Sequence, residues 1–329
     1  MTNSPMYEKP TFAVFGDVHA HFSPLFKALV HLGWDETSKK IPQNLTVIQL
    51  GDLIHKGPYT NEIIAFVDEI IRVNNNDPES GQWVQLMGNH ESQYFEGTPD
   101  FWKRECDMHS IATLGSWLDQ GHMKFHYVIE QADGKPFIVT HAGVNPFWYY
   151  RAEPFFKSGA RDIHLTQDEY LEFRESQTVE RFSQWMDELV NVPAVACIPG
   201  EMLGGKFNPK AGPVWAETVR EVYSAWRGEK VPFHQIHGHV TPFSWTVRKF
   251  FPLVPAVIRD EIRLFKEKRR SLWTNIDGSM FYGIDNGFEG YADLERMRPL
   301  ILDANGVIDS DKGIEYFVNS RGKLEKTQS

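Results

Sequence analysis

The chain has 329 residues, of which 41% are hydrophobic and 13% aromatic, a composition typical of a folded protein and not of a disordered one. Its formal net charge of -10 and pI of about 5.7 disfavour nucleic acid as a partner, because a nucleic-acid binder needs a basic surface. No stretch approaches the roughly 18 uninterrupted apolar residues of a membrane span, and the first ten residues, "MTNSPMYEKP", show no positively charged start followed by an apolar run. We therefore expect a cytoplasmic protein with no membrane partner.

Short apolar runs rich in β-branched residues predict buried strands along the first two thirds of the chain. Between the first three runs, residues 24–34 and 61–73 carry apolar side chains at helical spacing. Alternating strands and helices are typical of parallel βαβ units, so we expect an α/β fold. The predicted strands cover residues 12–16, 45–51, 83–88, 137–143 and 233–238.

The rest of the chain has a different pattern. Residues 145–232 are aromatic-rich and largely helical in periodicity, whereas the chain after residue 270 has short runs and a hairpin turn signal, "ANG", at 304–306. We expect a single domain over residues 1–329, with a helical insertion at about 145–232 and an antiparallel β C-terminal part. We interpret the aromatic residues of 145–185 as helical core, with a lid that stacks on a nucleobase as the alternative.

The two cysteines, Cys106 and Cys197, stand far apart and form no C-x-x-C pair. We expect two free, mostly buried thiols. Any metal ligands must therefore come from other residue types.

Such residues follow the predicted strands. In an α/β sheet, side chains just past the carboxyl ends of parallel strands converge on one crevice, where such folds bind their ligands. The candidate ligands are Asp17 and His19 in "GDVHAH", Asp52 in "GDLIHKGP", Asn89 in "GNHE", His141 in "THAG" and His239 in "HGHVTP".

This ligand set contains oxygen and imidazole donors and no thiolate, which suits Mn²⁺, Fe or Zn²⁺. Six ligands exceed the three or four that one catalytic ion takes, so we expect two divalent ions, Mn²⁺ foremost, with a carboxylate that bridges them. An ion pair of this kind suits the hydrolysis of phosphate esters. Lys56 could contact the phosphate, and His90 could give a proton to the leaving oxygen.

The ordered series "GDVH", "GDLIHKG", "GNHE", "THAG" and "GHVTP" resembles the calcineurin-like metallophosphoesterases, and among them the phosphoprotein phosphatase branch. The series of that branch is D-x-H, G-D-x-V-x-R-G, G-N-H-E, H-G or H-A-G, and G-H-T-P. The match extends from Asp17 to His239, and "GIDNG" at 283–287 is similar to an I-D-T-G element of bacterial members. The resemblance implies a hydrolase with a central β-sandwich flanked by helices.

It also implies a role for each matching residue. The reaction would be a direct attack of metal-bridged hydroxide on phosphorus, without a phosphoenzyme. Asp17 and His19 would bind the first metal, Asp52 would bridge both, and Asn89, His141 and His239 would complete the second, with His90 as general acid and Lys56 in the place of an arginine that grips phosphate.

The sequence departs from the family pattern at two neighbouring positions. Lys56 replaces a bidentate arginine, which predicts a looser grip on phosphate. His55 stands where protein phosphatases commonly have an aspartate that orients the catalytic histidine, and symmetrical dinucleoside tetraphosphatases resemble the chain in lacking it. For a second phosphate-binding arginine, expected near 213–217, the candidates are Arg220 and Arg227.

Two histidines that flank the proposed ligands, His21 and His237, are expected to have supporting roles.

Residues 248–270 are strongly basic, and we interpret them as an amphipathic helix with a solvated face. The alternative is a landing surface for a phosphate-rich substrate, or a nucleic-acid contact, built from Arg259, Arg263, Lys266, Lys268, Arg269 and Arg270.

These observations predict a metal-dependent phosphohydrolase that cleaves phosphomonoesters, with a phosphoprotein among the possible substrates. The alternative is a hydrolase of dinucleoside polyphosphates or other nucleotides. Because His55 and Lys56 depart from the pattern, a metal-binding module without catalysis is a third, less favoured reading, and a nuclease is a fourth. The expected partner is thus a phosphoprotein, a nucleotide or a small phosphoester.

Overall fold

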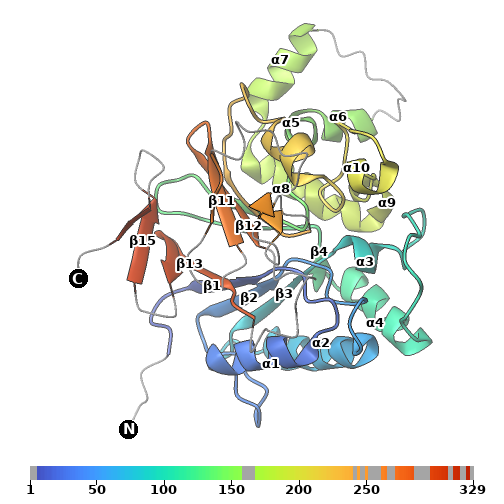
Figure 1. Ribbon diagram of the computed structural model, residues 1–329, viewed down its shortest axis with the longest axis vertical. Helices are drawn as coiled ribbons and strands as arrows, with labels where there is room; N and C mark the ends of the chain where they lie inside the picture. Colours follow the sequence, from blue (N-terminus) through green and yellow to red (C-terminus); the bar gives the residue numbers. More distant parts are fainter. Residues whose placement is uncertain are drawn as a thin grey trace.

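The computed structural model describes residues 6–157, 167–239, 243–244, 249–250, 261–264, 271–284, 297–309, 314–318 and 324–326. In this part of the chain, two β-sheets lie at the centre and helices pack outside them (Figure 1). The fold is mixed α/β, as the sequence predicts. None of the helices in these ranges is both long and apolar enough to cross a membrane.

The first sheet has a parallel half and an antiparallel half. Helix α1 (Phe22–His31) connects its first two parallel strands and helix α2 (Thr60–Asn74) the next two, which confirms the predicted βαβ units. The strand order is β16-β15-β14-β13-β1-β2-β3-β4. The bounds are β1 (Thr11–Phe15), β2 (Leu45–Gln49), β3 (Gln82–Leu86), β4 (Met123–Lys124), β13 (Leu300–Asp303), β14 (Gly306–Asp309), β15 (Ile314–Val318) and β16 (Leu324–Lys326).

The second sheet has the order β10-β11-β12-β7-β6-β5. Its central strands β6, β7 and β12 are parallel, and antiparallel hairpins flank them on both sides. Strands β8 (Phe243–Ser244) and β9 (Lys249–Phe250) form a separate two-stranded sheet. The bounds are β5 (His126–Ile129), β6 (Phe137–Thr140), β7 (His234–His237), β10 (Arg263–Leu264), β11 (Ser271–Ile276) and β12 (Ser279–Ile284).

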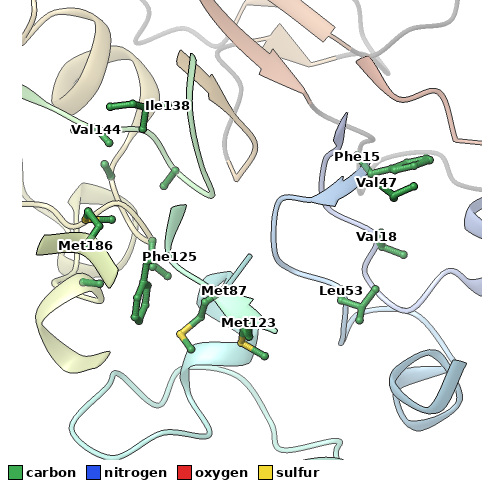
Figure 2. Close-up of a cluster of buried hydrophobic side chains, with 14 of the residues drawn as sticks. Phe15, Val18, Val47, Leu53, Met87, Met123, Phe125, Ile138, Val144 and Met186 are labelled. Carbon is green, nitrogen blue, oxygen red and sulfur yellow. The ribbon is translucent and has the colours of Figure 1, made fainter. Parts of the chain in front are cut away.

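The alternation of side chains along the strands separates two hydrophobic cores. In β1, Val14 belongs to the core between the sheets, whereas Ala13 and Phe15 belong to the larger outer core, because successive strand side chains point to opposite faces. Figure 2 shows part of the outer core, with Phe15 beside Val47 of the neighbouring strand. Both faces of the parallel strands are thus buried, which explains their continuous apolar runs.

The predicted helical region consists of short helices that lie beyond the second sheet (Figure 1). Its aromatic side chains form core: the rings of Trp148 and Trp185 are 5.3 Å apart and those of Tyr149 and Phe182 5.4 Å. All four are buried, so the interpretation as core is confirmed for these residues. The elements here are α5 (Pro146–Tyr150), α6 (Ala152–Lys157), α7 (Gln167–Ser176), α8 (Val179–Glu188), the 3₁₀ turn η1 (Leu189–Asn191), α9 (Pro193–Ala196), α10 (Glu201–Gly204) and the π-helical turn η2 (Thr218–Tyr223).

Some expectations need correction or extension. The helix expected over 248–270 is wrong for 249–250 and 263–264, which lie in strands β9 and β10, since short pairing partners override the helical pattern there. The rest of that segment and part of "GIDNG" lie outside the described residues. Helix α4 (Met108–Asp119) was not predicted, nor was strand β5. The cysteines are free, with Cys197 buried and Cys106 half-buried.

The two sheets approach each other closely where β1 ends. A Cβ atom on Gly16 would lie 2.3 Å from the carbonyl oxygen of Ile284, the last residue of β12. Only a residue without a side chain therefore fits at this position.

We predict opposite effects for two Gly→Ala changes. Gly16→Ala should lower the free energy of unfolding by about 1 to 3 kcal/mol, because backbone of β12 must shift. Gly115→Ala, inside helix α4 where an added Cβ meets nothing within 4 Å, should raise it by about 0.5 to 1 kcal/mol. Urea unfolding measures both, and equal effects would contradict the close approach of the sheets.

Candidate metal centre

The structure brings all six predicted ligands to one place between the sheets. Asp17 and His19 follow β1, Asp52 follows β2, and Asn89 begins α3 (Asn89–Ser92) directly after β3. In the second sheet, His141 follows β6 and His239 follows β7. Each ligand thus stands just past the carboxyl end of a strand, where such side chains were expected.

Short distances connect the ligands across the two sheets. His141 Nε2 lies 3.0 Å from Asn89 Oδ1, 3.2 Å from His239 Nδ1 and 3.5 Å from Asp52 Oδ1. The backbone N–H of His239 donates to Asp17 Oδ1 at 3.1 Å. These contacts tie the ends of β1 and β7 together.

The donor atoms form two groups that share one carboxylate. Asp52, His141 and His239 make one group, and Asp52, His19 and His90 make the other, with the ligand atoms of each group within 4.8 Å of one another. A shared carboxylate is the arrangement that two neighbouring ions require. Asp52 is thus the carboxylate that belongs to both donor groups, and its bridging role stays a prediction.

The amide of Asn89 shows that the site fits a cation. Its terminal atom that faces the cluster lies 3.0 and 3.1 Å from the two oxygens of Asp52, 3.0 Å from His141 Nε2 and 3.1 Å from His239 Nδ1. With the amide oxygen there, it faces three hydrogen-bond acceptors, which are the two Asp52 oxygens and His141 Nε2. Such a set repels itself unless a positive ion lies among the atoms, or unless the amide turns and its NH₂ donates to them.

Two ligand histidines present a lone pair to this cluster. The Nδ1–H of His141 donates to the carbonyl of Leu50 at 2.9 Å, so Nε2 is left as the acceptor. The Lys56 ammonium donates to His19 Nε2 at 3.2 Å, and an ammonium can only donate. Burial lowers the pKa of His19 and of His141, and the neutral ring is the form that binds metal.

The charge of Lys56 acts on several of the candidate ligands. Its half-buried ammonium is in contact with His19 and its charge favours the ionised forms of Asp17 and Asp52. An ion bound to His19 would meet a positive charge at close range. The ammonium would then have to turn away from His19.

The backbone of the site is strained. A positive φ is uncommon for residues other than glycine and marks places where the fold imposes a conformation for function. Site residues with φ in the left-handed region are His19 (50°), Ala20 (55°), Asp52 (54°), His55 (66°), Lys56 (63°) and His239 (63°).

A buried carboxylate that was not predicted holds this backbone. The two oxygens of Glu91 accept from the N–H groups of Asp52 and Leu53, each at 2.8 Å, of Gly88 at 3.0 Å and of Ile54 at 3.3 Å. Glu91 is completely buried. Its signal in the sequence was the last letter of "GNHE", which we read only for its asparagine and histidine.

The environment of His90 explains the departure at position 55. His55 Nδ1 lies 2.8 Å from His90 Nδ1, and both rings are buried. The position that holds an aspartate in protein phosphatases therefore still contacts the proposed acid, but through an imidazole. His90 Nε2 lies 3.9 Å from Asp52 Oδ2.

Aromatic side chains pack against two histidines of the site. The ring of His90 is 5.0 Å from that of Phe101 and 5.5 Å from that of Trp102, and Trp215 is 5.8 Å from His239. In the stretch 213–217, where a phosphate-binding arginine was expected, the side chain that contacts the site is thus the tryptophan Trp215.

The two candidate arginines lie in other contacts. Arg220 pairs with Glu201 and Arg227 with Glu261, all four at least partly exposed. His237, one of the two histidines expected to have supporting roles, forms a hydrogen bond of 2.9 Å between its Nε2 and the Tyr223 hydroxyl. Neither arginine is placed against the six ligands by any contact that the described residues show.

An acceptor cluster of this kind, at the strand ends of two packed sheets, defines a metal-dependent hydrolytic centre. A family model described as calcineurin-like phosphoesterase matches residues 10–250. The chain therefore belongs to the calcineurin-like phosphoesterase family. The recognised resemblance, the fold class and the assignment to an enzyme family are confirmed.

Two curated proteins illustrate the similarity of the chain to known proteins. Over 187 residues the chain is 24% identical to a symmetrical bis(5'-nucleosyl)-tetraphosphatase of Klebsiella pneumoniae. The aligned region covers 54% of this chain and 58% of that protein. It is 25% identical over 164 residues to an uncharacterised protein of Schizosaccharomyces pombe, with 45% of this chain and 47% of that one covered. The chain spans about half the length of the curated relatives that it matches.

Among solved structures, a cold-active protein tyrosine phosphatase gives a TM-score of 0.45 at 16% identity, with 97% of this chain and 79% of that chain covered. The cold-active protein-tyrosine phosphatase of a psychrophilic Shewanella species gives 0.42, also at 16% identity, with 97% and 81% covered.

We predict that Asp17→Asn stabilises the metal-free protein, and more so as the pH rises. Burial and the charge of Asp52 raise the pKa of Asp17 to about 7. The folded protein thus keeps a proton that the unfolded chain releases near pH 4, so the free energy of unfolding falls between about pH 4 and about pH 7. Asparagine avoids this loss, which should reach about 2 to 4 kcal/mol at pH 8.

Urea unfolding with chelator, at steps from pH 4 to pH 8, measures the difference between Asp17→Asn and the wild type. Added Mn²⁺ should reverse the order, because the carboxylate then binds the ion. A difference that stays the same at both ends of the pH range would show that Asp17 is ionised in the metal-free protein.

Proposed function

We propose that the chain is a metal-dependent phosphohydrolase that cleaves phosphomonoesters. The observation that carries the proposal is the convergence of two donor groups on Asp52 in a member of the calcineurin-like phosphoesterase family. A pair of divalent ions, Mn²⁺ by preference and Fe or Zn²⁺ otherwise, would supply an activated water and neutralise the phosphate oxygens.

The proposal assigns the residues as follows. His90 lies on the Asp52 side of the site and would give a hydrogen to the leaving oxygen, and Lys56 would bind a phosphate oxygen. The ligands would be Asp17 and His19 for the first ion, Asp52 for both, and Asn89, His141 and His239 for the second.

The domain assignment is part of the same proposal. We infer one metallophosphoesterase domain over residues 1–329, in which 145–232 is a helical insertion. It is supported by the strand pairing, because β13 lies beside β1 and β12 beside β7. The strands after the family match thus belong to the same two sheets. A cytoplasmic location stays a prediction.

A second substrate class has one observation in its favour. The matched Klebsiella protein is a symmetrical bis(5'-nucleosyl)-tetraphosphatase, and this chain, like the dinucleoside tetraphosphatases, lacks an aspartate at position 55. Dinucleoside polyphosphates are therefore the second candidate substrates. Their leaving group is a nucleotide phosphate, which needs less protonation than the alkoxide of phosphoserine.

A substrate panel tests the function. Chelator-stripped protein should gain hydrolysis of p-nitrophenyl phosphate on addition of Mn²⁺, and the ratio between a phosphopeptide and diadenosine tetraphosphate would identify the class. Asp52→Asn should lower kcat by about 10²- to 10³-fold or more, whereas Asp119→Asn, an exposed carboxylate on α4, should not change it. Two bound ions with no turnover on any substrate would favour a metal-binding module without catalysis.

We predict that Lys56→Met affects metal and substrate in opposite directions. Removal of the ammonium 3.2 Å from His19 Nε2 should tighten the binding of the first ion several-fold. The KM for p-nitrophenyl phosphate should rise by about 10-fold, because one charge-assisted hydrogen bond to phosphate is lost. Calorimetric metal titration and steady-state kinetics measure the two effects, with Lys27→Met on the exposed face of α1 as the control.

A further inference from the structure

The Tyr94 hydroxyl is arranged so that it donates to His55. The backbone N–H groups of Glu105 and Cys106 donate to its oxygen at 3.1 and 3.2 Å, and they use its two acceptor positions. The Tyr94 O–H must then find an acceptor. His55 Nε2 lies 2.7 Å away, and the nearby Cys106 thiol is a much weaker acceptor.

Gln93 gives an independent indication of the same polarity. Its Oε1 accepts from the backbone N–H of Trp102 at 3.0 Å, which fixes the orientation of the amide. The NH₂ of Gln93 consequently faces His55 Nε2, at 3.5 Å. Two side chains thus direct hydrogens at the same nitrogen, so His55 Nε2 is an acceptor and its ring hydrogen lies on Nδ1.

The hydrogen on His55 Nδ1 determines the polarity of His90. The two Nδ1 atoms are 2.8 Å apart, and only one of them can carry the hydrogen between them. Because His55 carries it, His90 Nδ1 accepts, and the ring hydrogen of His90 lies on Nε2. That atom faces the site, 3.9 Å from Asp52 Oδ2.

We propose that Gln93 and Tyr94, acting through His55, fix the tautomer of His90 so that Nε2–H points into the site as a hydrogen-bond donor. Gln93, Tyr94 and His55 are positioning residues. His90 lies close enough to His19 and Asp52 to complete a three-ligand group, but a nitrogen that carries a hydrogen has no lone pair for a metal. The inference rests on the proposed function in one respect, that Nε2–H of the neutral ring donates a hydrogen bond to the leaving oxygen of a phosphate ester.

The surroundings of His55 support the assignment. His55 has a φ of 66°, its backbone N–H donates to the Thr60 hydroxyl at 3.2 Å, and its side chain is fully buried. A fully buried imidazole with a close partner at each ring nitrogen has little freedom to turn over and exchange its nitrogens.

A matched pair of substitutions tests the inference. In Asn and Asp, the terminal atoms stand at the same number of bonds from Cα as Nδ1 of histidine. In His55→Asn an amide NH₂ can still donate to His90 Nδ1, so Nε2–H should persist. In His55→Asp the carboxylate can only accept, so the hydrogen should move to His90 Nδ1 and leave Nε2 as an acceptor.

The readout is the two-bond ¹H–¹⁵N correlation spectrum of the full chain with ¹⁵N-labelled histidines, in metal-free and Zn²⁺-loaded samples. The His90 signals are identified by their absence in His90→Gln. We expect a protonated Nε2 and an unprotonated Nδ1 in the wild type and in His55→Asn, and the reverse in His55→Asp. A wild-type His90 with its hydrogen on Nδ1, or identical spectra of the two variants, would overturn the inference.

Metal content and kinetics add two further outcomes. Elemental analysis of His90→Gln should find as many ions as in the wild type, and the loss of an ion would identify His90 as a ligand. His55→Asp should change kcat by about 10-fold or more with little change in KM, and a change in KM alone would argue against a role at the leaving oxygen. The spectra need no turnover, so failure of the proposed phosphohydrolase activity would leave the tautomer decided.

Discussion

Asp17 and Asp52 are buried together between the two sheets, and the surrounding structure is organised by the need to balance their charge. Burial raises the pKa of Asp17 to about 7 and of Asp52 to about 6. Taking two carboxylates out of water is costly unless hydrogen bonds or positive charge accompany them. The backbone N–H groups of His90 and His239 each donate to one of them, and the Lys56 ammonium lies nearby. Divalent ions would complete the balance, because the neutral imidazoles supply donor atoms without adding charge.

The approach of the chain segments follows from this arrangement. Glu91 gathers the backbone N–H groups that follow β2 and those that precede α3, so two neighbouring strand ends have a fixed spacing. An added Cβ on Gly88 would lie 2.2 Å from the nitrogen of Asp52. Only glycine allows the two backbones to come this close. The glycines of "GDLIHKG" and "GNHE" are thus required by geometry, before any chemistry is considered.

The predictability of the structure differs between its parts for physical reasons. In the parallel strands and in the helix at 61–73, the pattern of apolar residues is visible in the segment itself. The local sequence was therefore sufficient to predict these elements. Helix α4 was missed because it contains Gly115 and polar residues, which weaken its helical pattern. Its one start signal is Asp107, whose carboxylate accepts from the backbone N–H of Ser110, and a single capping residue is a weak signal. The convergence of the six candidate ligands could be predicted because each of them follows a strand, and the ends of parallel strands meet at one edge of a sheet.

The supporting residues could not be read in this way. Sequence alone showed that His55 is not an aspartate, but its contact with His90 depends on two consecutive residues, His55 and Lys56, in the left-handed conformation. No pattern of polar and apolar letters specifies that backbone. The orientation of His55 further depends on a loop some forty residues later, through Tyr94. Such long-range hydrogen bonds become visible only when the fold brings the partners together.

The fold gives His141 and His90 opposite tautomers. In each ring, the tautomer is set by the group that contacts the nitrogen facing away from the site. At His141, that nitrogen meets the carbonyl of Leu50, so the hydrogen lies outside and a lone pair points inward. At His90, it meets the imidazole of His55, which is itself supplied with hydrogens by Tyr94 and Gln93, so the hydrogen points inward. An acceptor behind the ring therefore directs a lone pair into the site, as a metal ligand requires, and a donor behind the ring directs a hydrogen into it. The division of labour within one cluster of histidines is set by their outer partners, since the side chains themselves are chemically identical.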